Sequence, residues 1–100
     1  METVINIKPL KTQFSGKGEV LGYMFTQLEK GSHSYLYEVR NEDNDEIHYE
    51  VFKKKINTQY DCISYPRSKS FGIWAWTTPD IKRALEILEN INESILTETL

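Results

Sequence analysis

The chain has 100 residues, of which 39% are hydrophobic and 27% charged, and its net charge is −3. This length and composition favour one small globular domain with its own core, and no stretch approaches the ~20 apolar residues of a membrane span. The acidic balance argues against a generally basic nucleic-acid-binding protein. The single cysteine, Cys62, cannot form an internal disulfide, and residues 3–10 are too polar for a signal peptide, so we expect a cytoplasmic protein.

Alternating apolar residues predict a series of strands in the first three quarters of the chain. Residues 1–18 form an N-terminal arm, in which residues 3–8, TVINIK, predict a short strand. The segments 19–28, 33–40 and 46–54 are rich in aromatic and β-branched residues and are separated by short polar turns. This spacing is typical of an antiparallel meander.

Residues 70–92, SFGIWAWTTPDIKRALEILENIN, predict a strand that runs directly into an amphipathic helix. Thr78 is the expected N-cap, Pro79 the first helical residue, and Asp80 a favourable charge in the first turn. The helix is expected over residues 78–95. Its apolar stripe is formed by Ile81, Ala84, Leu85, Leu88, Ile91 and Ile95, and it is widened by Ile87 and Leu96.

These elements predict one α+β domain, with an antiparallel β-meander sheet of four to five strands over residues 19–77 and the C-terminal helix packed on one face. The face expected to receive the helix holds Tyr35, Tyr37, Val39, Ile47, Tyr49, Val51, Phe71, Ile73 and Ala75. The opposite face is expected to hold Leu36, Glu38, Arg40, His48, Glu50, Phe52, Trp74 and Trp76. Because one helix covers only one face, this second face should be exposed, paired with a partner, or covered by the N-terminal segment.

The aromatic residues of this second face suggest an interaction surface. Our leading interpretation is a small cytosolic, non-catalytic binding or interaction module. It would form a homodimer or bind another protein partner. Two copies could bury their aromatic faces against each other around Trp74 and Trp76, since isologous contacts of this kind are common in homodimers. This interpretation needs no cofactor and no membrane.

A second interpretation is the binding of single-stranded nucleic acid, which needs aromatic platforms beside a local basic track. Residues 53–69 carry five basic residues against the single acidic residue Asp61. In this interpretation the stacking residues are Phe52, Trp74 and Trp76, and the phosphate-binding residues are Lys53, Lys55, Arg67 and Lys69. The plainer alternative is a solvated strand end beside a self-association face.

Patterns for catalysis and metal binding are weak. Cys62 and Arg67 have the spacing C-x4-R rather than the C-x5-R of a phosphatase loop, so a buried structural thiol is favoured. Glu38, His48 and Glu50 fall on the expected open face and suit acid–base chemistry, but a cross-strand charge pattern is the simpler interpretation. No cysteine or histidine pair has metal-ligand spacing. We therefore expect neither a metal site nor an enzyme.

The predicted order of elements resembles the repeat of the purine-rich-element-binding proteins, in which four antiparallel strands are followed by one helix. No motif residue is matched, so the resemblance is one of element order. It implies two intertwined repeats whose sheets bind single-stranded nucleic acid. The acidic excess of this chain departs from that expectation.

Overall fold

The computed structural model describes residues 7–98, with side chains up to Glu93. Its elements in chain order are β1 (Gln13–Ser15), the 3-10 helix η1 (Gly18–Val20), β2 (Tyr23–Lys30), β3 (Ser34–Asn41), β4 (Ile47–Lys53), β5 (Ile56–Asn57), β6 (Cys62–Ile63), the 3-10 helix η2 (Ser68–Ser70), β7 (Ala75–Thr78) and α1 (Ile81–Glu98). The strand predicted over residues 3–8 lies mostly outside the described residues. At its end, Lys8 forms an isolated parallel bridge with Cys62.

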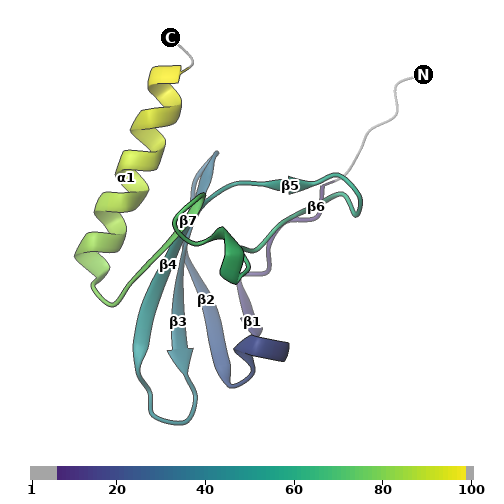
Figure 1. The fold of residues 1–100 in the computed structure, drawn as a ribbon, viewed down its shortest axis with the longest axis vertical. Coiled ribbons are helices and arrows are strands. Elements are labelled where there is room, and N and C mark those ends of the chain that lie inside the picture. The colour runs from purple at the N-terminus through teal and green to yellow at the C-terminus, as the bar shows by residue number, and fades with distance from the viewer. Residues whose placement is uncertain (1–6, 99–100) are drawn as a thin grey trace.

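Five strands form one sheet in the order β1-β2-β3-β4-β7, and every neighbouring pair is antiparallel. Helix α1 packs against β3, β4 and β7 on one side of this sheet (Figure 1). Strands β5 and β6 form a separate hairpin that projects from the sheet. The predicted α+β architecture, an antiparallel sheet with one C-terminal helix on one face, is confirmed.

The register between β3 and β4 decides which side chains share a face. Tyr35 pairs with Phe52 and Leu36 with Val51, so odd-numbered positions of β3 lie beside even-numbered positions of β4. The predicted faces assumed the opposite parity and are wrong, because Val51 faces the helix with Leu36 while Tyr35 faces away from it with Phe52. Residues 34–37 are all buried, so the hydrophobic pattern of β3 could not select between two registers that differ by one residue.

The core between the sheet and α1 is formed by the buried residues Leu36, Val51, Ala84 and Ile91, with Tyr49, Trp76, Ile81, Ile87 and Leu88 packed around them. A hydrogen bond of 2.7 Å from the Ser34 hydroxyl to Asn92 Oδ1 also joins β3 to the helix. The predicted apolar stripe differs at Leu85, which is 44% exposed, whereas Ile87 packs against this core as predicted. Ile95 and Leu96 lie outside the described side chains.

Helix α1 begins at Ile81 rather than at residue 78, because Asp80 is its N-cap. Asp80 Oδ1 accepts the backbone N–H of Lys82 at 3.0 Å, and its carbonyl accepts the N–H of Ala84 at 3.0 Å. Thr78 ends β7 and accepts the N–H of Asp80 at 3.2 Å. The predicted cap at Thr78 is therefore two residues too early.

The strand predicted over residues 70–77 is also shorter than expected, since β7 begins at Ala75. A turn precedes it, in which Gly72 has a φ of +90° and donates its N–H to the carbonyl of Ala75 at 2.7 Å. Glycine adopts this left-handed conformation readily, and it interrupts a strand. As a result Ile73 lies at the turn and is 72% exposed, instead of packing beneath the helix.

The sheet face away from α1 is covered by the chain itself. Ile63, Tyr65 and Phe71, which follow the β5–β6 hairpin or belong to it, pack on this face together with Ile7 and Leu10 from the N-terminal arm. The Tyr65 ring is central to this cover. Its centroid lies 4.8–5.5 Å from those of Phe14, Phe25, Tyr37 and Phe52. Cover by the N-terminal segment, one of the three alternatives for this face, is therefore part of the answer, and residues 56–71 contribute to the cover as well.

Candidate ligand-binding site

Two hollows flank residues 64–70 on the sheet face away from α1. The larger, about 940 Å³, lies between this segment and η1, and we call it the aromatic groove. The smaller, about 350 Å³, lies between the same segment and β5, and we call it the cationic pocket. Tyr65 and Arg67 line both hollows, so the two adjoin. Both volumes fall in the range of about 300–1,000 Å³ that is typical of ligand sites.

The cationic pocket gathers positive charge without a compensating acid. Lys55, Arg67 and Lys69 line it, and none of its lining residues is acidic. Its remaining polar lining comes from Asn57, Ser64 and Ser70, whose amide and hydroxyl groups can donate hydrogen bonds. An anion is therefore the ligand whose charge complements this pocket.

Two turns bring these cations together. After β5, Asn57 Oδ1 accepts the backbone N–H of Gln59 at 2.9 Å, and the returning chain is fixed by a bond of 2.7 Å from the Ser64 N–H to the Lys55 carbonyl. In η2 the carbonyl of Arg67 accepts the Ser70 N–H at 2.8 Å. Lys55 therefore faces Arg67 and its neighbours across the pocket although a dozen residues separate them.

Trp74 supplies the aromatic side of the cationic pocket. Lys55 Nζ lies 5.3 Å from the centroid of the Trp74 ring, a cation–π contact. The ring also packs edge-to-face against Phe52, with centroids 6.3 Å apart and planes at 78°. Trp74 is only half-buried, so part of it remains open to a ligand.

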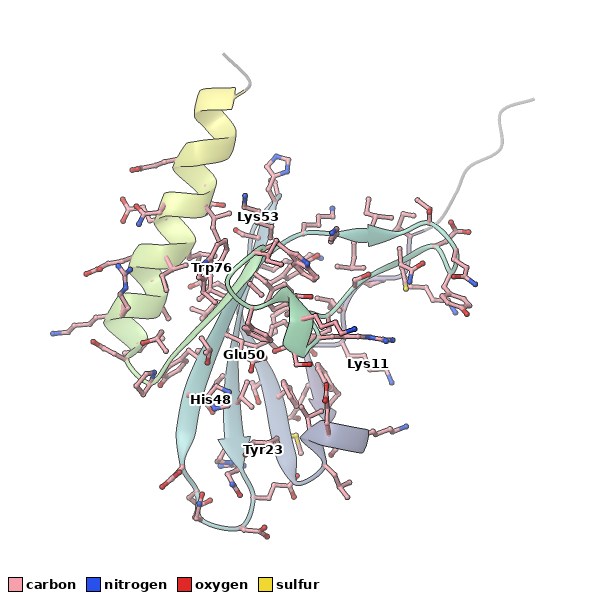
Figure 2. The ribbon with its side chains drawn as sticks, in the orientation of Figure 1. Lys11, Tyr23, His48, Glu50, Lys53 and Trp76 are labelled. Carbon is pink, nitrogen blue, oxygen red and sulfur yellow. The ribbon has the colours of Figure 1, made fainter. Side chains whose placement is uncertain are left out.

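The structure brings together four of the seven binding residues predicted from sequence: Lys55, Arg67, Lys69 and Trp74. It places the other three elsewhere. Phe52 is fully buried at the sheet surface and offers no stacking face. Lys53 and Trp76 line a different hollow of about 290 Å³ beside Arg83 of the helix, and Figure 2 shows Trp76 on the side of the sheet that carries α1.

The predicted common platform of Trp74 and Trp76 is wrong because only one of the two belongs to the strand. Trp76 lies within β7 opposite Val51 and so faces the helix. Trp74 is the last residue of the turn before β7, and it packs on the opposite core. Alternation along a continuous strand would have placed both side chains on one face.

The aromatic groove has a floor of sheet residues and two walls of loop. Its floor includes Phe14 of β1, Phe25 of β2, and His48 and Glu50 of β4. One wall is formed by residues 17–20 and the other by residues 65–68 with Phe71. Its charged rim residues Lys17, Glu19 and Arg67 are all exposed.

Glu50 is the polar centre of this groove, and its side chain is only 13% exposed. The Tyr65 hydroxyl donates to Oε1 at 2.7 Å, and His48 Nε2 lies 3.0 Å from Oε2 (Figure 2 labels His48 and Glu50). Burial raises the pKa of Tyr65, and the charge of Glu50 and their hydrogen bond raise it further. Tyr65 therefore stays a neutral hydrogen-bond donor at any physiological pH.

His48 and Glu50 share a face, as their spacing in the sequence predicts, whereas the part played by Tyr65 was not predicted. Tyr65 lies in a segment without periodicity, and its only signal is an aromatic residue among polar and basic ones. Glu38, the third predicted acid–base residue, pairs with Tyr49 and lies on the helix side of the sheet. The predicted set of Glu38, His48 and Glu50 is therefore not assembled.

Other chemistry finds little support in the described part of the chain. Cys62 is a free thiol and is partly exposed rather than buried. Among the residues whose positions are described, no three His, Cys, Asp or Glu side chains are grouped to hold a metal ion. The one α-helix described, α1, lacks the apolar character needed to cross a membrane.

Comparisons with protein-family models, with curated proteins and with solved structures found no match to this chain. The geometry of the two hollows is therefore the basis for assigning a function.

Proposed function

We propose that the protein is a non-catalytic binding module for single-stranded nucleic acid, and that phosphate groups bind in the cationic pocket. The observation that carries this proposal is the convergence of Lys55, Arg67 and Lys69 beside Trp74 with no acidic residue among them. Single-strand binding requires an aromatic stacking surface next to a local positive track, and net charge of the whole protein matters less.

The distribution of acid in the chain supports the same assignment. Residues 41–46, NEDNDE, comprise the last residue of β3 and the turn to β4. In this segment Asn41 and Asn44 accept the backbone N–H groups of Asp43 and Glu46 at 2.9 Å. Figure 1 shows this turn at the opposite end of the sheet from the β5–β6 hairpin. The four acidic residues of this turn are thus separated from the pocket, and charges further apart than about 10 Å are largely screened at moderate salt.

The contact between Lys55 and Trp74 suits a ligand that carries both a phosphate and a base. A base that stacks on Trp74 displaces the Lys55 ammonium from the ring, and the ammonium is then free to pair with the adjoining phosphate. Stacking of a base on an aromatic side chain contributes about 1–3 kcal/mol, against about 0.5–1 kcal/mol for an exposed cation–π contact. The exchange is therefore favourable.

The proposal is tested with a fluorescently labelled oligothymidylate, whose polarisation is followed as protein is added at several salt concentrations. We expect affinity to fall as salt rises. The double variant Arg67→Ala/Lys69→Ala should reduce the slope of log affinity against log salt by about 1.4, since each phosphate contact on a single strand contributes about 0.7. The matched control is Lys82→Ala, which removes an exposed cation on α1 and should leave the slope unchanged.

Two results would contradict the proposal. One is the absence of binding at low salt. The other is binding that the double variant and the Lys82→Ala variant weaken equally, because the cationic pocket would then have no special part in it.

Self-association through an aromatic sheet face stays a prediction. The face on which it was expected is largely covered by Ile63, Tyr65 and Phe71, and no described feature favours it over the binding of nucleic acid. The mass in solution by light scattering measures it directly, and either oligomeric state is compatible with the cationic pocket.

A further inference from the structure

We propose that the aromatic groove receives a base of the bound strand and that Glu50 selects guanine there. This inference rests on the proposed binding of single-stranded nucleic acid, and it assigns a sequence preference to that binding. It concerns the larger hollow, which shares Tyr65 and Arg67 with the phosphate-binding pocket.

The two hollows are arranged for one continuous strand. Tyr65 and Arg67 line both of them, so a phosphate near Arg67 lies at the boundary between pocket and groove. A nucleotide that follows the one on Trp74 along the strand is then directed into the groove. The groove volume of about 940 Å³ exceeds that of the pocket, about 350 Å³, and leaves room for a purine.

Aromatic side chains make the groove suitable for a planar ligand. Phe14 and Phe71 line it and are only half-buried. The ring of Phe14 is held in place by a parallel stack on Phe25, with centroids 4.7 Å apart and planes at 3°. A base can therefore stack on a surface whose orientation is already fixed, and this lowers the entropic cost of binding.

Glu50 gives the groove its hydrogen-bonding preference. A carboxylate accepts hydrogen bonds and does not donate them, and its two oxygens offer about four lone pairs. In the Nε2–H tautomer, His48 fills one lone pair on Oε2, and the Tyr65 hydroxyl fills one on Oε1. Each oxygen thus keeps acceptor capacity, and the two oxygens together match a ligand edge that carries two adjacent donors.

Among the bases, guanine has such an edge, formed by its N1–H and its N2 amino group. Adenine and cytosine place a ring-nitrogen acceptor beside their amino group, and thymine and uracil flank their single N–H with two carbonyl oxygens. These acceptors would oppose one of the carboxylate oxygens. Watson–Crick edges of unstacked bases are the groups that proteins read in single strands.

The rim charges favour this ligand over a free organic cation, which is the other obvious match for a carboxylate. Lys17 and Arg67 stand at the rim with the single acid Glu19, so the entrance is weakly positive. A cation is repelled there, whereas a polyanion that presents a neutral base is attracted.

The test compares a short oligothymidylate with the same strand carrying one central guanosine, and with a third strand carrying inosine in that place. Inosine keeps N1–H and lacks the amino group. We expect the wild-type protein to bind the guanosine strand about tenfold more tightly than oligothymidylate, the scale of one bidentate contact, and to bind the inosine strand with intermediate affinity.

The discriminating variant is Glu50→Gln, because glutamine presents one acceptor and one donor. It should lose the preference for guanosine, measured as the ratio of its affinities for the guanosine strand and for oligothymidylate. Glu19→Gln, the same change of charge at an exposed rim position, should keep it. Circular dichroism establishes that each variant is folded, and the inosine strand tests the contact without any variant.

The outcomes separate the two proposals. If no strand binds, the proposed function fails and the guanine preference fails with it. If oligothymidylate binds but a central guanosine or inosine does not raise the affinity, only the present inference is overturned. A guanosine preference that survives Glu50→Gln also overturns it, since the selecting group would then lie elsewhere.

Discussion

At the scale of single residues, Tyr65 does most to join the loop of residues 64–70 to the sheet. Its ring contacts four other aromatic rings, and its hydroxyl donates to Glu50 Oε1 at 2.7 Å. Replacing Tyr65→Phe keeps the ring and removes the hydrogen bond. We expect the free energy of unfolding, measured by urea denaturation at neutral pH, to fall by about 1.5–3 kcal/mol, as for bonds to charged groups.

The control for this change is Tyr60→Phe, at a side chain that is 66% exposed at the end of the β5–β6 hairpin. It should alter the free energy of unfolding by less than about 0.5 kcal/mol, the usual range for surface substitutions. Equal effects of the two changes would show that the bond to Glu50 is not a stabilising link.

At the scale of elements, η1 forms a wall of the aromatic groove, and Gly16 lets it pack there. A Cβ on Gly16 would collide with the backbone carbonyl of Val20, and main chain cannot move aside as a flexible side chain does. Gly16→Ala should therefore lower the free energy of unfolding by about 1–3 kcal/mol, as overpacking does. Ser15→Ala, at the exposed neighbouring position, should have little effect in the same urea titration. Similar losses for both would remove the steric explanation.

Elements that depend on local signals were predictable, and those that depend on register or turns were not. The periodicity of α1 and the polar turns between β2, β3 and β4 can be recognised from neighbouring residues in the sequence. The parity of the β3–β4 pairing cannot be recognised in this way, because β3 carries large apolar side chains on both faces through residues 35–37. The same limit affects β7, where the turn at Gly72, with its positive φ, delays the start of the strand to Ala75 and leaves it four residues long.

The residues of the candidate site were likewise predictable where the signal is local and not where it depends on the fold. The basic character of residues 53–69 identified Lys55, Arg67 and Lys69, because charge is visible in sequence. Phe52 does lie on the predicted face, but it is fully buried there beside Tyr65. Trp76 does not join Trp74, because β7 begins only at Ala75 and directs Trp76 toward the helix. The aromatic groove could not be foreseen, since it requires Tyr65 to fold back over β4 from a segment without a periodic pattern.

At the scale of the whole molecule, the aromatic core should make stability sensitive to alkaline pH. Burial raises the pKa of Tyr35, Tyr37 and Tyr65 above the ordinary value of 10.0. Below pH 10 the folded and unfolded chains both keep these protons. Above it the unfolded chain releases them while the folded chain retains them, so the unfolded state binds fewer protons and stability falls as pH rises.

Each such tyrosine should lower the free energy of unfolding by up to about 1.4 kcal/mol per pH unit between its pKa in the unfolded chain and its pKa in the folded chain. Urea denaturation at a series of pH values above 10 measures this slope. In the Tyr65→Phe variant this slope should be smaller in magnitude by the contribution of one proton, about 1.4 kcal/mol per pH unit. An unchanged slope in that variant would mean that Tyr65 ionises equally in both states.

The placement of the two tryptophans on opposite sides of the sheet has an optical consequence. Trp76 lies against α1, and Trp74 lies in the cationic pocket under Lys55. The indole emission of the protein is therefore the sum of two independent signals, one sensitive to docking of the helix and the other to whatever enters the pocket. With either indole replaced by phenylalanine, the same molecule reports its folding or its occupancy without the other process contributing.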